Sequence, residues 1–324
     1  MTFLARLWTA GLCCLLGLIY SPASRAYPDQ PIKIVVPFAP GGSNDTLARI
    51  VAERLASRLK QPVLVDNRPG AGGNIGAEIV AKAAPDGYTL VMGSIGTHAT
   101  NGLIYPSMPF DTEKDFAPVT LVAAVTLVLV VHPSLPARST RDLIALLKAD
   151  PGKYNYASGG IGASQHLAAE LFKYQTHTQM MHVPYKGSAG ALADLLSGRV
   201  PIMFADLPLV LSHIRGGALR ALAVGDLERS PELPDVPTIA ESGVPGYDAN
   251  AWYGLFAPAG TPPAIVDRLQ KEVAGILAEP GIRQRLKEIG ARPGGMTPGD
   301  FREFQKKEIA RWRKVVETAQ IKME

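Results

Sequence analysis

Short runs of β-branched and apolar residues alternate with amphipathic stretches along almost the whole chain. Strands are predicted at residues 32–37, 63–65, 88–92, 119–131, 154–157, 180–183, 200–204, 219–224 and 251–257. Helices are predicted at 47–59, 75–84, 164–175 and 188–196, after a capping box at Ser139 and Asp142, and at 262–278, 282–289 and 301–319 near the end. This order of strands and helices is typical of an α/β fold.

Length and charge narrow the class of protein. A chain of 324 residues, 47 % of them hydrophobic, is long enough for about two domains at roughly 150 residues each. The formal net charge is +4, but Arg6 and Arg25 lie in the first 26 residues, and without them 31 basic residues face 29 acidic ones. No extended run of Lys and Arg occurs, and aromatic residues are sparse at 7 %, so nucleic acid is not an expected partner.

The first 26 residues are predicted to form a cleavable signal peptide. Arg6 is followed by an apolar run at 7–19, and small residues at Ser24 and Ala26 precede Tyr27. The run is short for a membrane span, which takes about 20 residues, although an uncleaved anchor helix is the alternative. Both cysteines, Cys13 and Cys14, lie in this segment, without the small preceding residue of a lipoprotein signal. We therefore expect a soluble periplasmic protein without disulfides.

Three glycine-rich segments each stand between a predicted strand and a predicted helix, at 39–45, 93–98 and 158–164. Such loops let backbone N–H groups converge, and the following helix adds positive potential, which suits a carboxylate or a phosphate. One loop alone is weak support, because strand-to-helix connections often use small residues. Three loops spread over both halves of the chain favour an anion-binding site.

Cofactor binding and catalysis are not expected. The segment 70–76 (GAGGNIG) resembles a dinucleotide fingerprint, but Ile75 breaks the pattern, so tight backbone packing is the preferred interpretation. Residues 27–324 contain no G-x-S-x-G, H-E-x-x-H or C-x-x-C motif. The histidine spacing does not suggest a metal site. His98 and His166 each follow a glycine-rich loop, where a hydrogen bond to a ligand is expected rather than catalysis.

Seven further motifs stand out: PFAPGGSND at 37–45, DNRPGAGG at 66–73, APDGYTL at 84–90, VPYKGS at 183–188, LRALAV at 219–224, WYGLFAP at 252–258 and EIARW at 308–312. Together they resemble the Bug family, the periplasmic solute receptors of tripartite tricarboxylate transporters. The resemblance extends from about Tyr27 to the end of the chain.

The resemblance implies a two-lobed, Venus-flytrap fold whose lobes are joined by two crossing strands, within 119–131 and 251–257. The expected lobes are 27–123 with 255–324, and 124–254. It implies a monomeric receptor, without enzymatic activity or cofactor, that delivers a small aliphatic or aromatic carboxylate to membrane permease subunits. The implied ligand-binding residues are Gly41, Gly42, Ser43, Asp45, Ser94, Gly96, Thr97, His98, Ser158, Gly159, Gly162, Ala163, Ser164, Tyr185 and Asp206.

Asp206 departs from the family pattern. The family usually places Asp and then Asn after the strand that ends at Phe204, whereas this chain has Ala205 and Asp206. A shift of one residue along a strand turns the side chain to the opposite face. Asp206 then either faces the cleft, which would require a hydrogen-bond donor on the ligand, or caps the turn at 208–214. We favour the cap.

Two other functions are compatible with the sequence. One is an exported enzyme acting on carboxylates, which would need a nucleophile or metal that no motif supplies. The other is a receptor that presents its ligand to a membrane sensor instead of a permease. The sequence names neither the ligand nor the resting state of the lobes.

Overall fold

A computed structural model describes residues 27–321 of the chain. The predicted signal peptide, residues 1–26, lies outside the described residues, as do residues 322–324.

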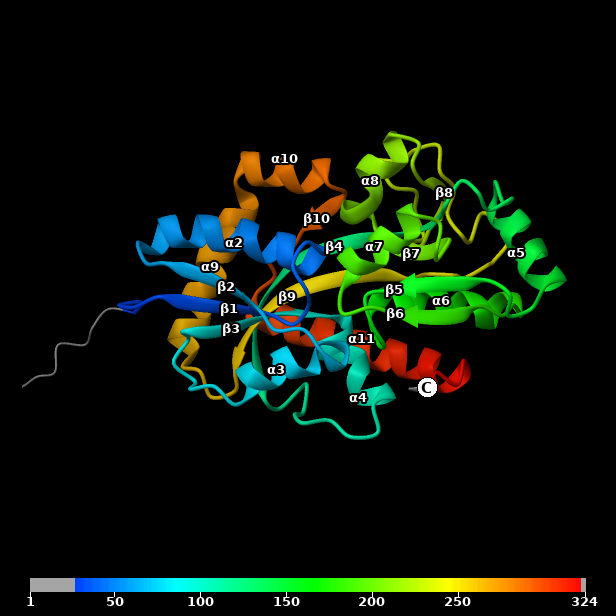
Figure 1. Cartoon of the computed structure of the whole chain (residues 1–324). Helices are drawn as coiled ribbons and strands as arrows, with labels where there is room; N and C mark the ends of the chain where they lie inside the picture. Colours follow the sequence, from blue (N-terminus) through cyan, green and yellow to red (C-terminus); the bar gives the residue numbers. More distant parts are fainter. Residues whose placement is uncertain (1–26, 322–324) are drawn as a thin grey trace, which may run out of the picture.

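The first lobe is built on a sheet that mixes parallel and antiparallel strands (Figure 1). Strand β1 (Ile32–Val36) lies between β2 (Val63–Asn67) and β3 (Thr89–Ser94), parallel to both. Strand β9 (Asn250–Pro258) runs antiparallel to β3 and to the first part of β4 (Phe116–Val131). The short strand β10 (Ala291–Pro293) pairs with β4 on its other side.

The second lobe has its own sheet. Strand β5 (Asn155–Ser158) pairs in parallel with β6 (Met181–Pro184) and β7 (Ile202–Asp206). Strands β7 and β8 (Arg220–Val224) both run antiparallel to the last part of β4. Parallel strands end at the same edge of a sheet, so the loops that follow β5 and β6 lie together.

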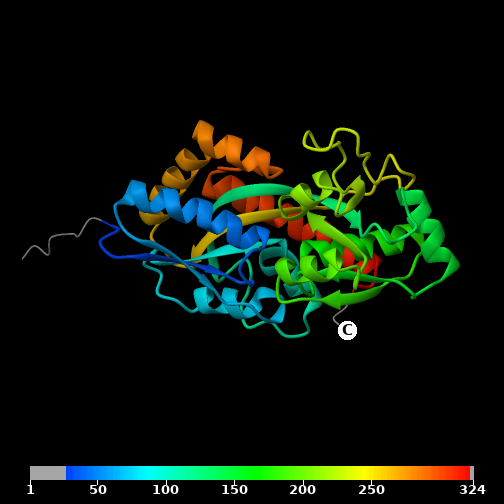
Figure 2. The same ribbon diagram turned by 45° about the horizontal axis from the view of Figure 1, so that its top comes forward.

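Strand β4 belongs to both sheets and joins the lobes. Of its 16 residues, those from Phe116 to Thr126 pair with β9, and those from Leu127 to Val131 pair with β7 and β8. Figure 2 shows β4 and β9 passing together between the two groups of helices. The predicted crossing strands at 119–131 and 251–257 fall within β4 and β9, and the predicted two-lobed α/β fold is confirmed.

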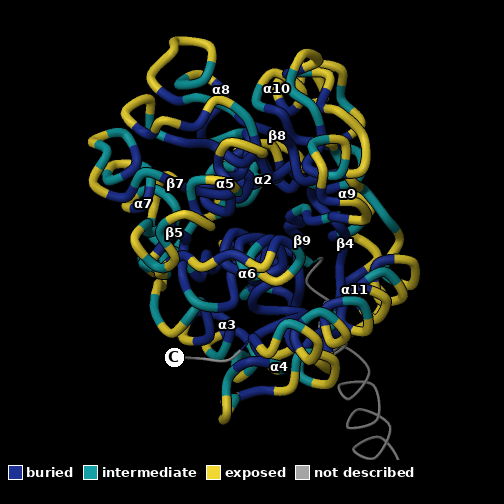
Figure 3. Tube along the Cα trace, turned by 90° about the vertical axis from the view of Figure 1, so that its right-hand side faces the viewer, coloured by how far each residue is buried: buried dark blue, intermediate teal, exposed yellow. Residues whose placement is uncertain are grey.

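Helices cover both sheets. In the first lobe they are α2 (Ser43–Leu59), η1 (Ala71–Gly73), α3 (Asn74–Ala81), η2 (Gly96–Thr100), α4 (Asn101–Ile104), α9 (Pro263–Ala278), α10 (Pro280–Glu288) and α11 (Pro298–Thr318). In the second lobe they are α5 (Thr140–Ala149), α6 (Ser164–Thr176), α7 (Ser188–Leu196) and α8 (Leu207–Arg215). Figure 3 shows that most of β4, β9 and α6 is buried, whereas the exposed backbone lies in peripheral loops and outer helix turns. The edge strands β2 and β6 are partly exposed.

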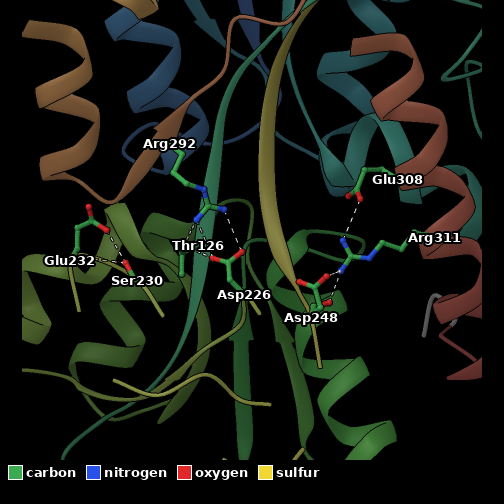
Figure 4. Close-up of polar contacts among 8 residues, drawn as sticks. All are labelled: Thr126, Asp226, Ser230, Glu232, Asp248, Arg292, Glu308 and Arg311. Carbon is green, nitrogen blue, oxygen red and sulfur yellow. Dashed lines mark hydrogen bonds and ion pairs between the residues drawn. The ribbon is translucent and has the colours of Figure 1, made fainter. Parts of the chain in front are cut away.

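Two ion pairs flank the crossing strands (Figure 4). Arg292 of β10 contacts Asp226 at 3.4 Å, and the Thr126 hydroxyl donates to the same carboxylate. Arg311 of α11 contacts Asp248 at 3.0 Å, just before β9. Each pair joins an arginine of a first-lobe element, β10 or α11, to an aspartate in the chain that follows β8 or precedes β9.

Candidate functional site

A narrow cavity lies where the two lobes meet. Five residues of the loops and helix ends of the first lobe and Tyr253 of β9 line one side of it. The residues on this side are Phe38, Gly42, Ser43, Asn44, Ser94 and Tyr253. The second lobe supplies Gly159, Ala163, Ser164, Gln165 and Ser188. The only ionisable side chain among these lining residues is the phenol of Tyr253.

Three helices begin at this cavity. Ser43, Ser164 and Ser188 are the first residues of α2, α6 and α7, and all three line it. None of the three helices has a side-chain cap at its N-terminus. The N–H groups of a first helical turn have no carbonyl partner within the helix, and the helix dipole places partial positive charge there. The cavity is therefore suited to bind an anion.

Hydrogen bonds connect the lobes around the cavity. The Ala39 N–H donates to the Lys186 carbonyl at 3.1 Å. The Thr100 hydroxyl donates to the Gly162 carbonyl at 3.1 Å, and the Tyr105 hydroxyl to the Ile161 carbonyl at 3.4 Å. The lobes are thus in contact on more than one side of the cavity.

Six of the sequence-predicted residues line the cavity: Gly42, Ser43, Ser94, Gly159, Ala163 and Ser164. Two other predicted residues, Gly41 and Asp45, stabilise the first loop without lining the cavity. The Gly41 N–H donates a hydrogen bond to the Asp45 carboxylate at 3.0 Å. Tyr185 lines a neighbouring cavity, together with the backbone of 70–73, and donates its hydroxyl to Asp194.

His98 and Thr97 stand behind the second loop. The Thr97 hydroxyl accepts from the Ser94 N–H at 3.0 Å and contacts Nδ1 of His98 at 2.8 Å. The His98 ring stacks on Phe256 with ring centroids 3.9 Å apart, and burial lowers its pKa to about 3. Gly96 begins η2 and is buried as well. These residues hold the loop in place but do not line the cavity.

A pair of histidines supports the third loop in the same way. The Gly162 N–H donates to Nδ1 of His166 at 3.2 Å, so it is already used within the lobe. His166 stacks on His182 at 4.3 Å, and Nε2 of His182 lies 2.6 Å from the Ser158 hydroxyl. Ser158 and Gly162 therefore act inside the loop, and His166 accepts a backbone hydrogen bond at Nδ1.

The preferred interpretation of Asp206 as a cap is wrong. Asp206 occupies the N-cap position of α8, but its side chain makes no capping hydrogen bond. Instead it is fully buried behind the cavity, where it accepts from the Tyr253 hydroxyl and from Nε2 of Gln165 at 2.9 Å. Burial raises the pKa of Asp206, and the nearby donors Tyr253, Ser43 and Gln165 partly oppose that shift. These three partners are themselves cavity-lining residues.

The sequence interpretation missed five lining residues: Phe38, Asn44, Gln165, Ser188 and Tyr253. Asn44 and Gln165 directly follow the predicted residues Ser43 and Ser164, so a signal was present. Ser188 opens a correctly predicted helix. Tyr253 lies in a crossing strand, where an apolar pattern does not distinguish it from a core residue.

Two kinds of feature were not found among residues 27–321. No group of three or more His, Cys, Asp or Glu in this range is arranged to hold a metal ion. No helix in this range is long and apolar enough to cross a membrane. The segment 70–76 is closely packed, because a Cβ on Gly76 would lie 2.7 Å from Cα of Pro37.

Known proteins share this architecture. The Rpa4515 protein of R. palustris, solved with adipate, is 44 % identical, with 92 % of this chain and all of that chain covered and a TM-score of 0.89. The periplasmic binding protein BugD is 34 % identical over 92 % of this chain and all of its own, with a TM-score of 0.87. MatC of Rhodopseudomonas palustris, solved with malate, is 34 % identical over 90 % of this chain and all of its own, also at 0.87.

Two lobes joined by crossing strands around a small cavity define the class of solute-binding receptors. The sequence model of a protein family, TctC, described as the tripartite tricarboxylate transporter family receptor, matches residues 47–321 of this chain. The chain therefore belongs to this family, which includes the Bug proteins. The resemblance inferred from the sequence motifs is thereby confirmed.

Proposed function

We propose that this protein is a periplasmic receptor that binds a small carboxylate between its lobes and delivers it to the permease subunits of a tripartite tricarboxylate transporter. The observation that carries the proposal is the convergence of three uncapped helix N-termini, from both lobes, on one cavity. Two related structures contain small carboxylates, adipate in one and malate in the other, which supports this ligand class.

Ligand binding is coupled to closure in this proposal. An anion that accepts hydrogen bonds from α2 in the first lobe and from α6 and α7 in the second stabilises the closed arrangement more than the open one. The permease then distinguishes the loaded receptor by its closed shape. The proposed lobes are 27–123 with 255–324, and 124–254, joined by β4 and β9.

The proposal includes a location for the protein and a mode of action on its ligand. The segment 1–26 serves as the cleavable signal peptide, and the mature protein begins near Tyr27. The receptor acts without chemistry on its ligand: apart from Tyr253, the lining residues supply no acid, base or charged nucleophile. The ligand should therefore be recovered unchanged after incubation.

The test is a thermal-shift comparison of dicarboxylic acids with their diamides and diesters. At 100 times Kd, a ligand stabilises the folded state by about 2.7 kcal/mol, and each kcal/mol raises Tm by roughly 2–4 °C at this size. We expect the acids to raise Tm and the neutral derivatives to have little effect. Equal shifts for an acid and its ester would contradict carboxylate binding. Conversion of the acid on incubation would favour an enzyme instead.

A further inference from the structure

Two buried amide oxygens in the wall of the cavity have no hydrogen-bond partner. They are Oδ1 of Asn44 and Oε1 of Gln165, whose residues are 4 % and 3 % exposed. Both side chains line the cavity, one from each lobe. Asn44 is the second residue of α2 and Gln165 the second residue of α6, so the two amides stand at equivalent positions of facing helices. Buried acceptors are rarely left without a partner.

The orientation of each amide is fixed by what its nitrogen contacts. Nδ2 of Asn44 donates to the Met92 carbonyl at 3.1 Å. Nε2 of Gln165 donates to Oδ1 of Asp206 at 2.9 Å and to the Ser188 hydroxyl at 3.3 Å. A carbonyl oxygen and a carboxylate oxygen cannot donate, so neither amide can turn around without losing this bond. The amide oxygens are left for a partner from outside the protein.

We propose that these two oxygens accept hydrogen bonds from the ligand, so that the receptor selects carboxylic acids carrying a hydroxyl, amino or amide N–H group over unsubstituted diacids. Asp206 is a positioning residue in this proposal, because it holds the Gln165 amide with its oxygen free. The inference rests on the proposed function and specifies its ligand class.

Two kinds of group in the cavity would then bind different parts of the ligand. The N–H groups at the helix N-termini donate to a carboxylate, while the amide oxygens accept from the substituent. A hydroxyl group donates one hydrogen and satisfies one of the two oxygens, whereas an amino group can satisfy both. An unsubstituted diacid satisfies neither, and that loss favours its substituted analogue. Selection of this kind comes from unpaired groups in the wrong complex as much as from new bonds in the right one.

Matched ligand pairs test the proposal on the wild-type protein. Isothermal titration would compare succinate with malate, glutarate with 2-hydroxyglutarate, and adipate with 2-hydroxyadipate, each pair differing by one hydroxyl group. We expect at least one hydroxy acid to bind about tenfold more tightly than its parent, which corresponds to 1.4 kcal/mol.

Variants then assign the selection to named residues. Gln165→Met removes the amide at similar length and should reduce the ratio of the two Kd values toward one. Gln175→Met is the matched control, because Gln175 lies on the same helix, also has an unpartnered buried oxygen, and is remote from the cavity lining. It should leave the ratio unchanged.

Asp206 is tested by two substitutions. Asp206→Leu removes the acceptor that orients Gln165 and should lower the ratio. Asp206→Asn keeps an oxygen that Nε2 of Gln165 can bond and should retain the ratio. A purely structural role would change both affinities of a pair together. Circular dichroism establishes that each variant is folded, and the wild-type pairs decide the question for any variant that is not.

The outcomes separate the inference from the proposed function. If no acid binds the wild-type protein, both fail. If acids bind but the hydroxyl group has no effect in any pair, or if Gln165→Met keeps the full ratio, the inference is overturned and the receptor function stands.

Discussion

At the scale of single residues, buried histidines make stability depend on pH. Burial lowers the pKa of His98 to about 3 and that of His166 to about 4. His182 also has a pKa lowered to about 3, by burial and by the neighbouring His166. A group whose pKa is lower in the folded state stabilises the fold above its unfolded pKa, near 6.5, and this contribution is lost as pH falls. The fold should therefore weaken between pH 6.5 and 4.

His98 gives the sharpest test of this dependence. With a folded pKa of about 3, linkage predicts that its share of the unfolding free energy falls by about 2 kcal/mol between pH 7.5 and pH 5. His98→Phe keeps a ring against Phe256 and removes the titration. Urea unfolding at both pH values should show a smaller loss for the variant than for the wild type. His177→Asn is the control, because this exposed, left-handed position tolerates Asn. An unchanged loss in His98→Phe would exclude His98 as a source.

Asp206 should act in the opposite direction. Burial raises its pKa in the folded state, so the folded protein holds this proton more tightly and loses stability as pH rises from about 4 through the folded pKa. Asp206→Asn removes that dependence. Across a series from pH 4 to 7.5, the unfolding free energy of the variant minus that of the wild type should increase with pH. A difference that decreases would mean that the hydrogen bonds from Tyr253 and Gln165 outweigh burial.

At the scale of elements, periodicity predicted the long segments and missed the short ones. The limits 188–196 match α7, and 164–175 matches α6 to within one residue. The segment η2–α4 at 96–104 was not predicted, because its glycine and threonine residues indicate a loop in isolation. Helix α8 was read only as a turn. The three loops were found because glycine next to a helix start is a local signal, whereas the burial of Asp206 depends on contacts from distant elements.

The start of α6 allows a test of helix N–H donation. Gly162→Pro is unsuitable, since Gly162 has φ of +81° and its N–H bonds His166. Ser164→Pro is compatible with the fold, because proline is favoured at the first helical position. It removes a backbone N–H and a hydroxyl, whereas Ser164→Ala removes the hydroxyl alone. We expect titration with a bound acid to show affinity about tenfold lower for Pro than for Ala, as for a hydrogen bond to a charged group. Equal affinities would place the carboxylate at α2 or α7.

At the scale of the whole molecule, the apparent free energy of ligand binding includes the free energy of closing the lobes. The apparent affinity falls when the closed state is less populated, even if every ligand contact is kept. In this structure the interlobe bond from Thr100 to the Gly162 carbonyl lies outside the cavity lining. The sequence could not reveal this bond, because the two residues lie in different lobes and the local sequence around one gives no information about its contact with the other.

Thr100→Val should therefore weaken ligand binding without touching the ligand. The Thr100 hydroxyl has one hydrogen, which it shares between the Gly162 carbonyl at 3.1 Å and the Ile95 carbonyl of its own lobe at 3.2 Å. Loss of the interlobe bond, worth at most about 0.5–1.5 kcal/mol, lowers the closed population and reduces affinity by up to about tenfold, mostly through faster dissociation. Thr176→Val is the control, because the Thr176 hydroxyl donates to the Phe172 carbonyl within one lobe.

Stopped-flow dissociation and small-angle scattering with and without a bound acid measure the two effects. The Thr100 variant should be more expanded without ligand and should close at saturation. If both variants dissociate alike, closure is set elsewhere, and the ion pairs of Arg292 and Arg311 beside the crossing strands become the next candidates.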